Sequence, residues 1–284
     1  MKISKYNVFI PYSNALFIYN TLWNTVFVIK KDKVKIWGIG YIQKYEIPPI
    51  DANAINVLKE KKIIIPDHID ELNLIQEKLS RAKLDESRYT MIIVPTLKCN
   101  FRCWYCYENH EHKRMMSAND LEKIELLVYK IIQTKNNLKT FDIQFFGGEP
   151  MIGYNKIVKP TLIFLKPILD AAKIKMTVGI TTNGYFFTKE NLSFLRSYNL
   201  DNLQITFDGN KQRHNAVRFS HKGEDTFDVI LNNVKMALSL KIHVTVRLNI
   251  SDETCLNVSD FLDSFESVSL PNRQFLLFSI QKVW

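Results

Sequence analysis

Three of the four cysteines in this chain lie close together, in the stretch TLKCNFRCWYCYE at positions 96–108. Cys99, Cys103 and Cys106 have the spacing C-x3-C-x2-C. Thiolates are soft ligands that suit zinc or iron–sulfur clusters, and a cluster of four irons needs four ligands. Because the loop offers three thiols, it can hold three irons and leave the fourth open to an exogenous ligand. The spacing therefore indicates a metal centre with one open position.

Two other interpretations of these cysteines stay open at this point. A structural zinc site would combine the three thiols with His110 or His112 in a closed Cys3His set. A disulfide framework is disfavoured, because four cysteines in 284 residues with no signal peptide are not typical of a secreted protein.

The elements that position the loop follow from the pattern around it. The loop leaves the short apolar run Met91–Pro95, which is typical of a buried strand. From Arg88 onward, strands alternate with helices, which predicts a parallel sheet or barrel. The predicted strands are Tyr89–Pro95, Phe141–Phe146, Lys175–Thr181, Asn202–Phe207, Ile242–Ile250 and Gln274–Val283. The predicted helices begin near Ser117, Lys156, Thr188, Thr226 and Asn257.

Polar segments follow several of these strands. FFGGEP covers 145–150, ITTNG covers 180–184, QITFDG covers 204–209, and HNAVRF covers 214–219. Each alone is also typical of an ordinary turn. Strand 242–250 alternates polar and apolar residues, so one face meets a cavity and Arg247 and Asn249 are expected to lie on it. The strand ends therefore predict a polar site beside the cysteines.

In this order, the segments CNFRCWYCY, FFGGEP, ITTNG, QITFDG and HNAVRF resemble those of radical S-adenosylmethionine (SAM) enzymes. The resemblance is closest to the SPASM-type peptide and protein maturases, which include the sulfatase maturases, and it lowers the weight of the zinc interpretation. It implies an α/β fold, a partial (β/α)6 barrel. It also implies that Cys99, Cys103 and Cys106 hold one [4Fe–4S] cluster whose fourth iron is chelated by SAM. An aromatic residue just before the last cysteine, here Tyr105, is also common in the family.

The resemblance also implies a set of SAM contacts. The glycine segment and its glutamate would bind the amino group of SAM, and the later hydroxyl and arginine would contact its ribose and carboxylate region. A guanidinium suits a carboxylate because it can make two parallel hydrogen bonds to it. Asp208 is open to two equal interpretations, as a functional residue or as a turn residue. The residues implied as cofactor-binding are Gly147, Gly148, Glu149, Thr182, Asn183, Thr206 and Arg218.

Two domains are predicted. Residues 1–85 contain short β-prone runs and two small helices, an α+β module ahead of the barrel. It is interpreted either as a winged-helix-like module that grips a leader peptide or as a plain extension that caps the barrel. Residues 86–284 form the radical SAM core, which is expected to be truncated after the sixth strand because no cysteine-rich C-terminal domain follows. The remaining thiol, Cys255, is expected to be dispensable.

The implied reaction is reductive cleavage of SAM, followed by hydrogen abstraction from a peptide or protein, such as a ribosomal precursor peptide. The electron would come from a reductase or a flavodoxin-type donor. One alternative is a truncated, non-catalytic paralogue or peptide-binding scaffold. Another is a radical SAM enzyme acting on RNA, for which only the net charge of +9 argues. The lysines are spread along the chain, so nucleic acid is not the expected partner.

The end of the chain and its hydropathy give two last expectations. The final strand, Phe275–Val283, is long and apolar, and such an edge is expected to dimerise, to recruit a C-terminal partner chain or to reduce solubility. No apolar run reaches the length of a membrane span, and the N-terminus lacks the apolar core of a signal peptide. A cytoplasmic location with no membrane partner is therefore predicted.

Overall fold

The computed structural model describes residues 1–12, 14–30, 35–37, 44–46, 52–106, 108, 114–251, 254 and 258–282. The chain divides into two compact units, Met1–Asp85 and Glu86–Trp284, and each is described by itself. Several residues singled out from the sequence lie outside the described ranges: His110, His112, Cys255 and the strand end at Val283.

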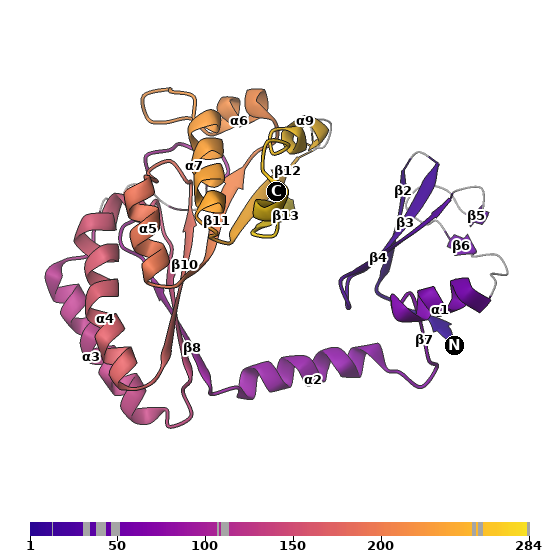
Figure 1. The fold of residues 1–284 in the computed structure, drawn as a ribbon, viewed down its shortest axis with the longest axis horizontal. Helices are drawn as coiled ribbons and strands as arrows, with labels where there is room; N and C mark the ends of the chain where they lie inside the picture. The colour runs from indigo at the N-terminus through magenta and orange to yellow at the C-terminus, as the bar shows by residue number, and fades with distance from the viewer. Residues whose placement is uncertain are drawn as a thin grey trace. The chain divides into compact units, whose positions relative to one another are not determined.

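The first unit is built on a three-stranded antiparallel sheet in the order β2-β3-β4. Its central strand alternates, so that Leu16 and Ile18 are fully buried and pack with Leu58 of α1 and with Ile63. Two further strand pairs, β1 with β7 and β5 with β6, complete the unit (Figure 1). The elements are β1 (Lys2–Ile3), β2 (Asn7–Tyr12), β3 (Ala15–Asn20), β4 (Thr25–Lys30), β5 (Lys35–Trp37), β6 (Lys44–Glu46), α1 (Ala52–Glu60), β7 (Ile64–Ile65) and α2 (Glu71–Leu84).

Helix α2 begins at Glu71, directly after a capping side chain. Asp70 is its N-cap, and the carboxylate accepts hydrogen bonds from the backbone N–H groups of Leu72 and Asn73. A capping side chain satisfies donors that have no partner in the first turn, so it fixes where the helix starts.

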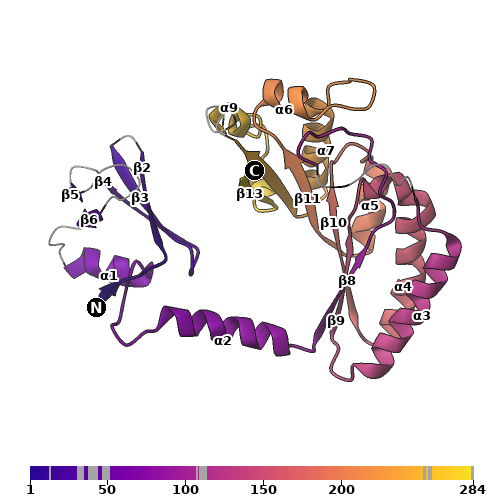
Figure 2. The ribbon, with the colours of Figure 1, turned by 180° about the vertical axis from the view of Figure 1, so that it is seen from behind.

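The second unit is a six-stranded parallel sheet in the order β13-β12-β11-β10-β9-β8, with every strand beside its neighbour in sequence. Helices between the strands run along the outside, and α3, α4 and α5 lie on one side of the strands in both views (Figures 1 and 2). The predicted α/β class with six parallel strands and a small N-terminal strand module is therefore confirmed. The strands are β8 (Arg88–Ile93), β9 (Thr140–Phe145), β10 (Lys175–Thr182), β11 (Leu200–Phe207), β12 (Val244–Ile250) and β13 (Leu276–Lys282).

Side-chain caps begin α3, α5 and α6 of this unit. Ser117 and Asp120 form a capping box at α3, and Thr188 and Asn191 form another at α5, as their spacing predicts. The sequence did not predict α6, a short helix capped by Asn210. The helices are α3 (Ala118–Thr134), α4 (Lys159–Ala171), α5 (Lys189–Ser197), α6 (Lys211–Val217), α7 (Phe227–Ser239), α9 (Val258–Asp263) and α10 (Leu270–Arg273), with a 3-10 turn (Pro150–Gly153) and a π turn (Tyr154–Val158) leading into α4.

The two faces of the sheet differ. Along β9, Phe141, Ile143 and Phe145 are buried with the helices in one core, while the alternate residues point to the other face. On that other face the strands carry polar side chains such as Gln144 and Arg247, which are partly exposed. A sheet with one apolar and one polar face leaves room for a polar site inside the curve of the strands. None of the described helices is long and apolar enough to cross a membrane.

Candidate active site

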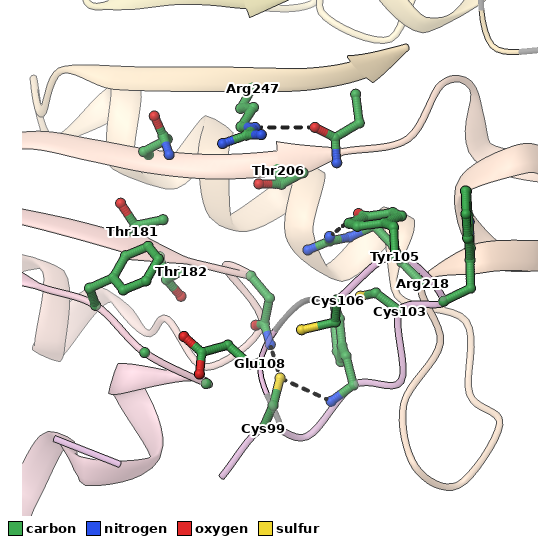
Figure 3. A pocket seen from close by; sticks show the side chains of 18 of the residues that line it. Cys99, Cys103, Tyr105, Cys106, Glu108, Thr181, Thr182, Thr206, Arg218 and Arg247 are labelled. Atoms are coloured by element: carbon green, nitrogen blue, oxygen red, sulfur yellow. Dashed lines mark hydrogen bonds between the residues drawn. The ribbon is translucent and has the colours of Figure 1, made fainter. Parts of the chain in front are cut away.

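A cavity of about 440 Å³ is lined by the cysteine loop and by residues of five successive strand ends, from β9 to β13. Figure 3 shows the three thiols grouped at one side of it and Arg247 on the strand wall opposite. Every predicted cofactor-binding residue except Glu149 lines this cavity. The lining residues are Cys99, Phe101, Cys103, Trp104, Tyr105, Cys106, Glu108, Phe146, Gly147, Gly148, Thr181, Thr182, Asn183, Gln204, Thr206, Arg218, Arg247, Asn249 and Lys282.

The cysteine loop is anchored between its first two cysteines. Phe101 is buried between them and packs edge-on against Tyr185, with ring centroids 5.8 Å apart. The backbone N–H of His221 donates to the carbonyl of Asn100 at 2.9 Å. Cys99 and Cys103 are partly buried, whereas Cys106 is exposed. The loop therefore presents thiols to the cavity from a fixed backbone.

Burial changes the acidity of two of these thiols. It raises the pKa of Cys99 to about 11, and it raises the pKa of Cys103 as well. A thiol in such surroundings is protonated at neutral pH, and a metal ion that binds it as thiolate must displace the proton. Metal loading at this loop is therefore coupled to proton release.

The described residues contain no group of three His, Cys, Asp or Glu side chains that converges on one metal ion. The thiols of Cys99, Cys103 and Cys106 line one cavity. The histidines of the zinc interpretation, His110 and His112, lie outside the described residues.

The glycine turn lies directly against the backbone that leads into the cysteine loop. Gly147 has a φ of 117°, and a Cβ there would meet Val94 at 2.6 Å and the Thr96 carbonyl at 2.8 Å. A Cβ on Gly148 would meet the Leu97 carbonyl at 2.5 Å. Gly148 also donates its N–H to the Thr96 carbonyl at 3.1 Å. Both positions require glycine because two backbones approach closely here.

Glu149 is fully buried and its carboxylate is directed into the protein. It accepts hydrogen bonds from the Met151 N–H at 2.9 Å, the Asn183 N–H at 2.8 Å, and the Thr182 hydroxyl at 2.8 and 2.9 Å. Burial raises the pKa of this carboxyl group, and those hydrogen bonds act in the opposite direction. The carboxylate therefore joins the end of β9 to the end of β10, and a direct contact with SAM stays a prediction.

Asn183 connects the end of β10 to the cysteine loop. Its Nδ2 donates to Asn100 Oδ1 at 2.7 Å and lies 3.9 Å from the Cys99 sulfur. Its Oδ1 accepts from the Tyr185 N–H at 3.0 Å. Asn183 is thus positioned beside the first cysteine by partners on both sides of its amide.

A second polar cluster links the loop to β11 and α6. The Tyr105 hydroxyl donates to Asp208 Oδ2 at 2.6 Å and accepts from Arg218 Nη1 at 2.6 Å. Arg218 Nε lies 3.5 Å from the same Asp208 oxygen and forms no hydrogen bond within the described chain. Burial raises the pKa of Asp208 and of Tyr105. The Arg218 guanidinium is therefore held in place at the cavity by Tyr105 and Asp208.

Sequence reasoning missed the residue that supports this cluster, His214. The ring is fully buried, with Nδ1 accepting from the Asp208 N–H at 3.4 Å and Nε2 lying 3.2 Å from the Thr226 hydroxyl. That hydroxyl donates its hydrogen to the Arg218 carbonyl at 2.5 Å. In its contact with the His214 ring the hydroxyl oxygen is therefore the acceptor, and Nε2 carries the ring hydrogen. Burial holds the pKa of His214 well below its usual value. The H-N-x-x-R spacing was the signal that could have predicted this support.

The far wall of the cavity comes from β11 and β12. Thr206 on β11 pairs in register with Arg247 on β12. Arg247 Nε donates to Asn249 Oδ1 at 3.1 Å, and both residues line the cavity as their alternation predicts. This wall carries polar groups on the side of the cavity opposite the thiols (Figure 3).

Comparison with known proteins identifies the family. The model of the radical SAM superfamily matches residues 93–255, more than half of the chain, and the chain belongs to that superfamily. Enzymes of this superfamily use a [4Fe–4S] cluster and SAM. The resemblance stated from the cysteine loop and the strand ends is therefore confirmed.

Curated relatives cover several activities. Radical SAM cyclopropyl synthase TigE of Paramaledivibacter caminithermalis is 28% identical, over 78% of this chain and 48% of its own length. A cysteine-type anaerobic sulfatase-maturating enzyme of Clostridium novyi is 23% identical, over 66% of this chain and 50% of its own. A GTP 3',8-cyclase of Campylobacter jejuni subsp. doylei is 30% identical, over 60% of this chain and 50% of its own. The chain spans about half the length of these relatives.

Among solved structures, native anSMEcpe with bound AdoMet and Cp18Cys peptide has a similar fold. Its TM-score is 0.58 at 20% identity, covering 69% of this chain and 51% of that one. This similarity concerns the fold alone, and it agrees with the parallel sheet described above.

Proposed function

We propose that this chain binds a [4Fe–4S] cluster through Cys99, Cys103 and Cys106, cleaves SAM reductively, and takes a hydrogen atom from a peptide or protein. The observation that carries the proposal is the single cavity that joins the three thiols to the glycine turn and to Arg218. These groups come from segments far apart in the chain, and a shared cavity is what a cofactor spanning them requires.

The residues of the cavity fit the cofactors. The three thiols are on one loop and line the same cavity. Gly147 and Gly148 line the cavity and bring the end of β9 directly against the backbone that leads into the cysteine loop. Arg218 is nearly buried and lines the cavity, and a guanidinium there suits the carboxylate of SAM. Thr206 offers a hydroxyl between these groups and the far wall.

When bound, the reduced cluster and SAM supply an organic radical that abstracts hydrogen, and the protein supplies binding, orientation and exclusion of water. Asn183 holds the loop near Cys99, and Glu149 holds Asn183 in turn. Tyr105 and Asp208 fix the direction of the Arg218 guanidinium. The chain thus positions the cofactors through hydrogen bonds that exist before they bind.

A peptide or protein substrate is supported by the relatives. One of them is a sulfatase-maturating enzyme, and a structure of similar fold holds a peptide. The N-terminal unit, with its own sheet and core, would be a site for gripping part of such a substrate. The chain spans about half the length of these relatives, and a peptide or protein substrate is therefore proposed for this chain from them.

Anaerobic purification followed by iron and sulfide analysis tests the cofactor. We expect about four irons and four sulfides in the wild-type chain, and a loss of most of them in Cys99→Ala, Cys103→Ala and Cys106→Ala. Cys255→Ala is the matched control and should keep the cluster. Stoichiometric zinc without sulfide would show that the proposal is wrong, and cleavage of SAM by the reduced protein would support it.

A further inference from the structure

The cavity contains two guanidinium groups in different electrostatic surroundings. Arg218 is close to Asp208 and to the Tyr105 hydroxyl, so its charge is compensated within the protein. Arg247 has one hydrogen-bond partner in the described chain, the neutral Asn249. No acidic side chain of the described residues forms an ion pair with Arg247. Its positive charge is therefore directed into the cavity without a counter-ion.

The geometry leaves the terminal nitrogens of Arg247 available. The bond to Asn249 Oδ1 uses the Nε–H. Asn249 is buried, so this support is rigid. A guanidinium fixed through Nε presents its remaining N–H groups as a fork, which matches the two oxygens of a carboxylate.

The acidic residue that lines the cavity, Glu108, does not supply that anion. Figure 3 shows Glu108 on the side of Cys99 and Arg247 on the strand wall opposite, beside Thr206. A partly buried cation without a partner is costly, and a bound anion offsets that cost. The cavity therefore has one end suited to the cofactors and another suited to a negatively charged group.

We propose that Arg247, oriented by Asn249, forms an anion subsite that binds a carboxylate of the substrate while the cofactors occupy the cysteine side. The inference rests on the proposed function and adds the chemical class that the substrate must carry. For a peptide, the carboxylate would be an acidic side chain or a free C-terminus near the position from which hydrogen is taken. Arg247 is then a specificity-determining residue.

The test uses the cluster-loaded chain and four small probes: N-acetylglutamate N′-methylamide, its uncharged glutamine counterpart, N-acetylalanine, and inorganic phosphate. Each is titrated by calorimetry with and without saturating SAM. The variants are Arg247→Gln, Arg247→Lys, and Arg196→Gln, which removes a positive charge from the exposed outer helix α5. Iron content and SAM binding of the wild-type chain are measured first, so that failure of the proposed function is seen separately.

With SAM present, we expect the two carboxylates to bind the wild-type chain at least about tenfold more tightly than the glutamine probe. Arg247→Gln should remove this preference, Arg247→Lys should retain part of it, and Arg196→Gln should leave it unchanged. The inference is overturned if no anion binds, or if Arg247→Gln binds the carboxylate probes as the wild type does. It is also overturned if carboxylate binding disappears once SAM is added, which would show that Arg247 binds SAM. Tighter binding of phosphate than of carboxylate would overturn the substrate class and indicate a nucleotide or other phosphate.

Discussion

The two sides of the cavity differ in how far their polar groups are already paired. On the cysteine side, Glu149, Asn183, Tyr105 and Asp208 are all engaged with partners inside the protein. On the strand wall, no partner of the Thr206 side chain is seen in the described chain, and Arg247 is held through Nε alone. Pre-paired groups give a rigid frame, whereas unpaired ones leave binding capacity for a ligand. The difference suggests that one side is built to hold cofactors and the other to recognise something more variable.

The comparison predicts that breaking the cysteine side costs stability. Glu149→Ala leaves the Thr182 hydroxyl and the N–H groups of Met151 and Asn183 without a buried acceptor. We expect a loss of about 3–5 kcal/mol in the free energy of unfolding, measured by urea denaturation, because a buried network loses its centre. Glu149→Gln should lose less, since it keeps one carbonyl acceptor.

Glu190→Ala, on the exposed first turn of α5, is the matched control and should change the unfolding free energy by less than about 0.5 kcal/mol. Equal stabilities of Glu149→Ala and the wild type would contradict the role of Glu149 in joining the ends of β9 and β10. Normal stability together with weakened SAM binding would instead support a direct contact between Glu149 and SAM.

The buried histidine gives the cysteine side a pH dependence. Burial lowers the pKa of His214 in the folded state, so the unfolded chain binds the proton more readily. This contribution to stability is complete above the unfolded pKa of about 6.5, and it falls by up to about 1.4 kcal/mol per pH unit below it, until the folded pKa is reached. Urea denaturation from pH 8 to pH 5 measures the slope.

In His214→Gln, stability should be lower than wild type at pH 8, and the difference should narrow as the pH falls. A difference that is constant with pH would show that His214 is protonated equally in the folded and unfolded chains. The ring of His214 packs against Phe207 and Phe227, so this pH dependence belongs to the cysteine side of the cavity.

How much of this was predictable depends on the range of the contacts. The loop, the glycine turn and the strand order follow from local patterns, and the capping boxes at Ser117 and Thr188 are local too. Tyr105 and Arg218 are 113 residues apart in sequence, and no local pattern indicates their contact. Asp208 was left open between a turn residue and a functional one, and only the fold brings it to Tyr105.

Two other features also depend on tertiary structure. The sequence of helix α6 is too short and too polar to show an apolar stripe. The helix forms because Asn210 caps it and because its own residue His214 is buried. Glu149 reads as a ligand from its motif, yet the surrounding strand ends use both of its oxygens. A motif identifies which residues matter, and the fold decides which of them face the ligand.

A smaller effect is expected from the Tyr105 hydroxyl, which connects the loop to the arginine. Tyr105→Phe removes the bonds to Arg218 and Asp208 and leaves the ring in place. We expect the cluster to remain and the dissociation constant for SAM to rise about tenfold, because the guanidinium is less well oriented. Tyr185→Phe, whose ring packs on Phe101, is the control and should bind SAM as wild type does. Loss of the cluster in Tyr105→Phe would show that the Tyr105 hydroxyl stabilises the cysteine loop and does not mainly orient Arg218.

The smallest predicted effect concerns Thr206, where the two sides of the cavity meet. Its side chain is partly buried, pairs in register with Arg247 on the next strand, and lines the cavity. If the hydroxyl binds the ribose of SAM, Thr206→Val should weaken SAM binding by about 0.5–1.5 kcal/mol, a factor of roughly two to ten, while Thr206→Ser should bind almost normally. Valine keeps the shape and the β-branching, so the fold is not disturbed. If Thr206→Val instead leaves SAM binding intact and weakens the anion probes, Thr206 belongs to the wall with Arg247, and the boundary between the cofactor side and the substrate side lies one strand nearer to the cysteines.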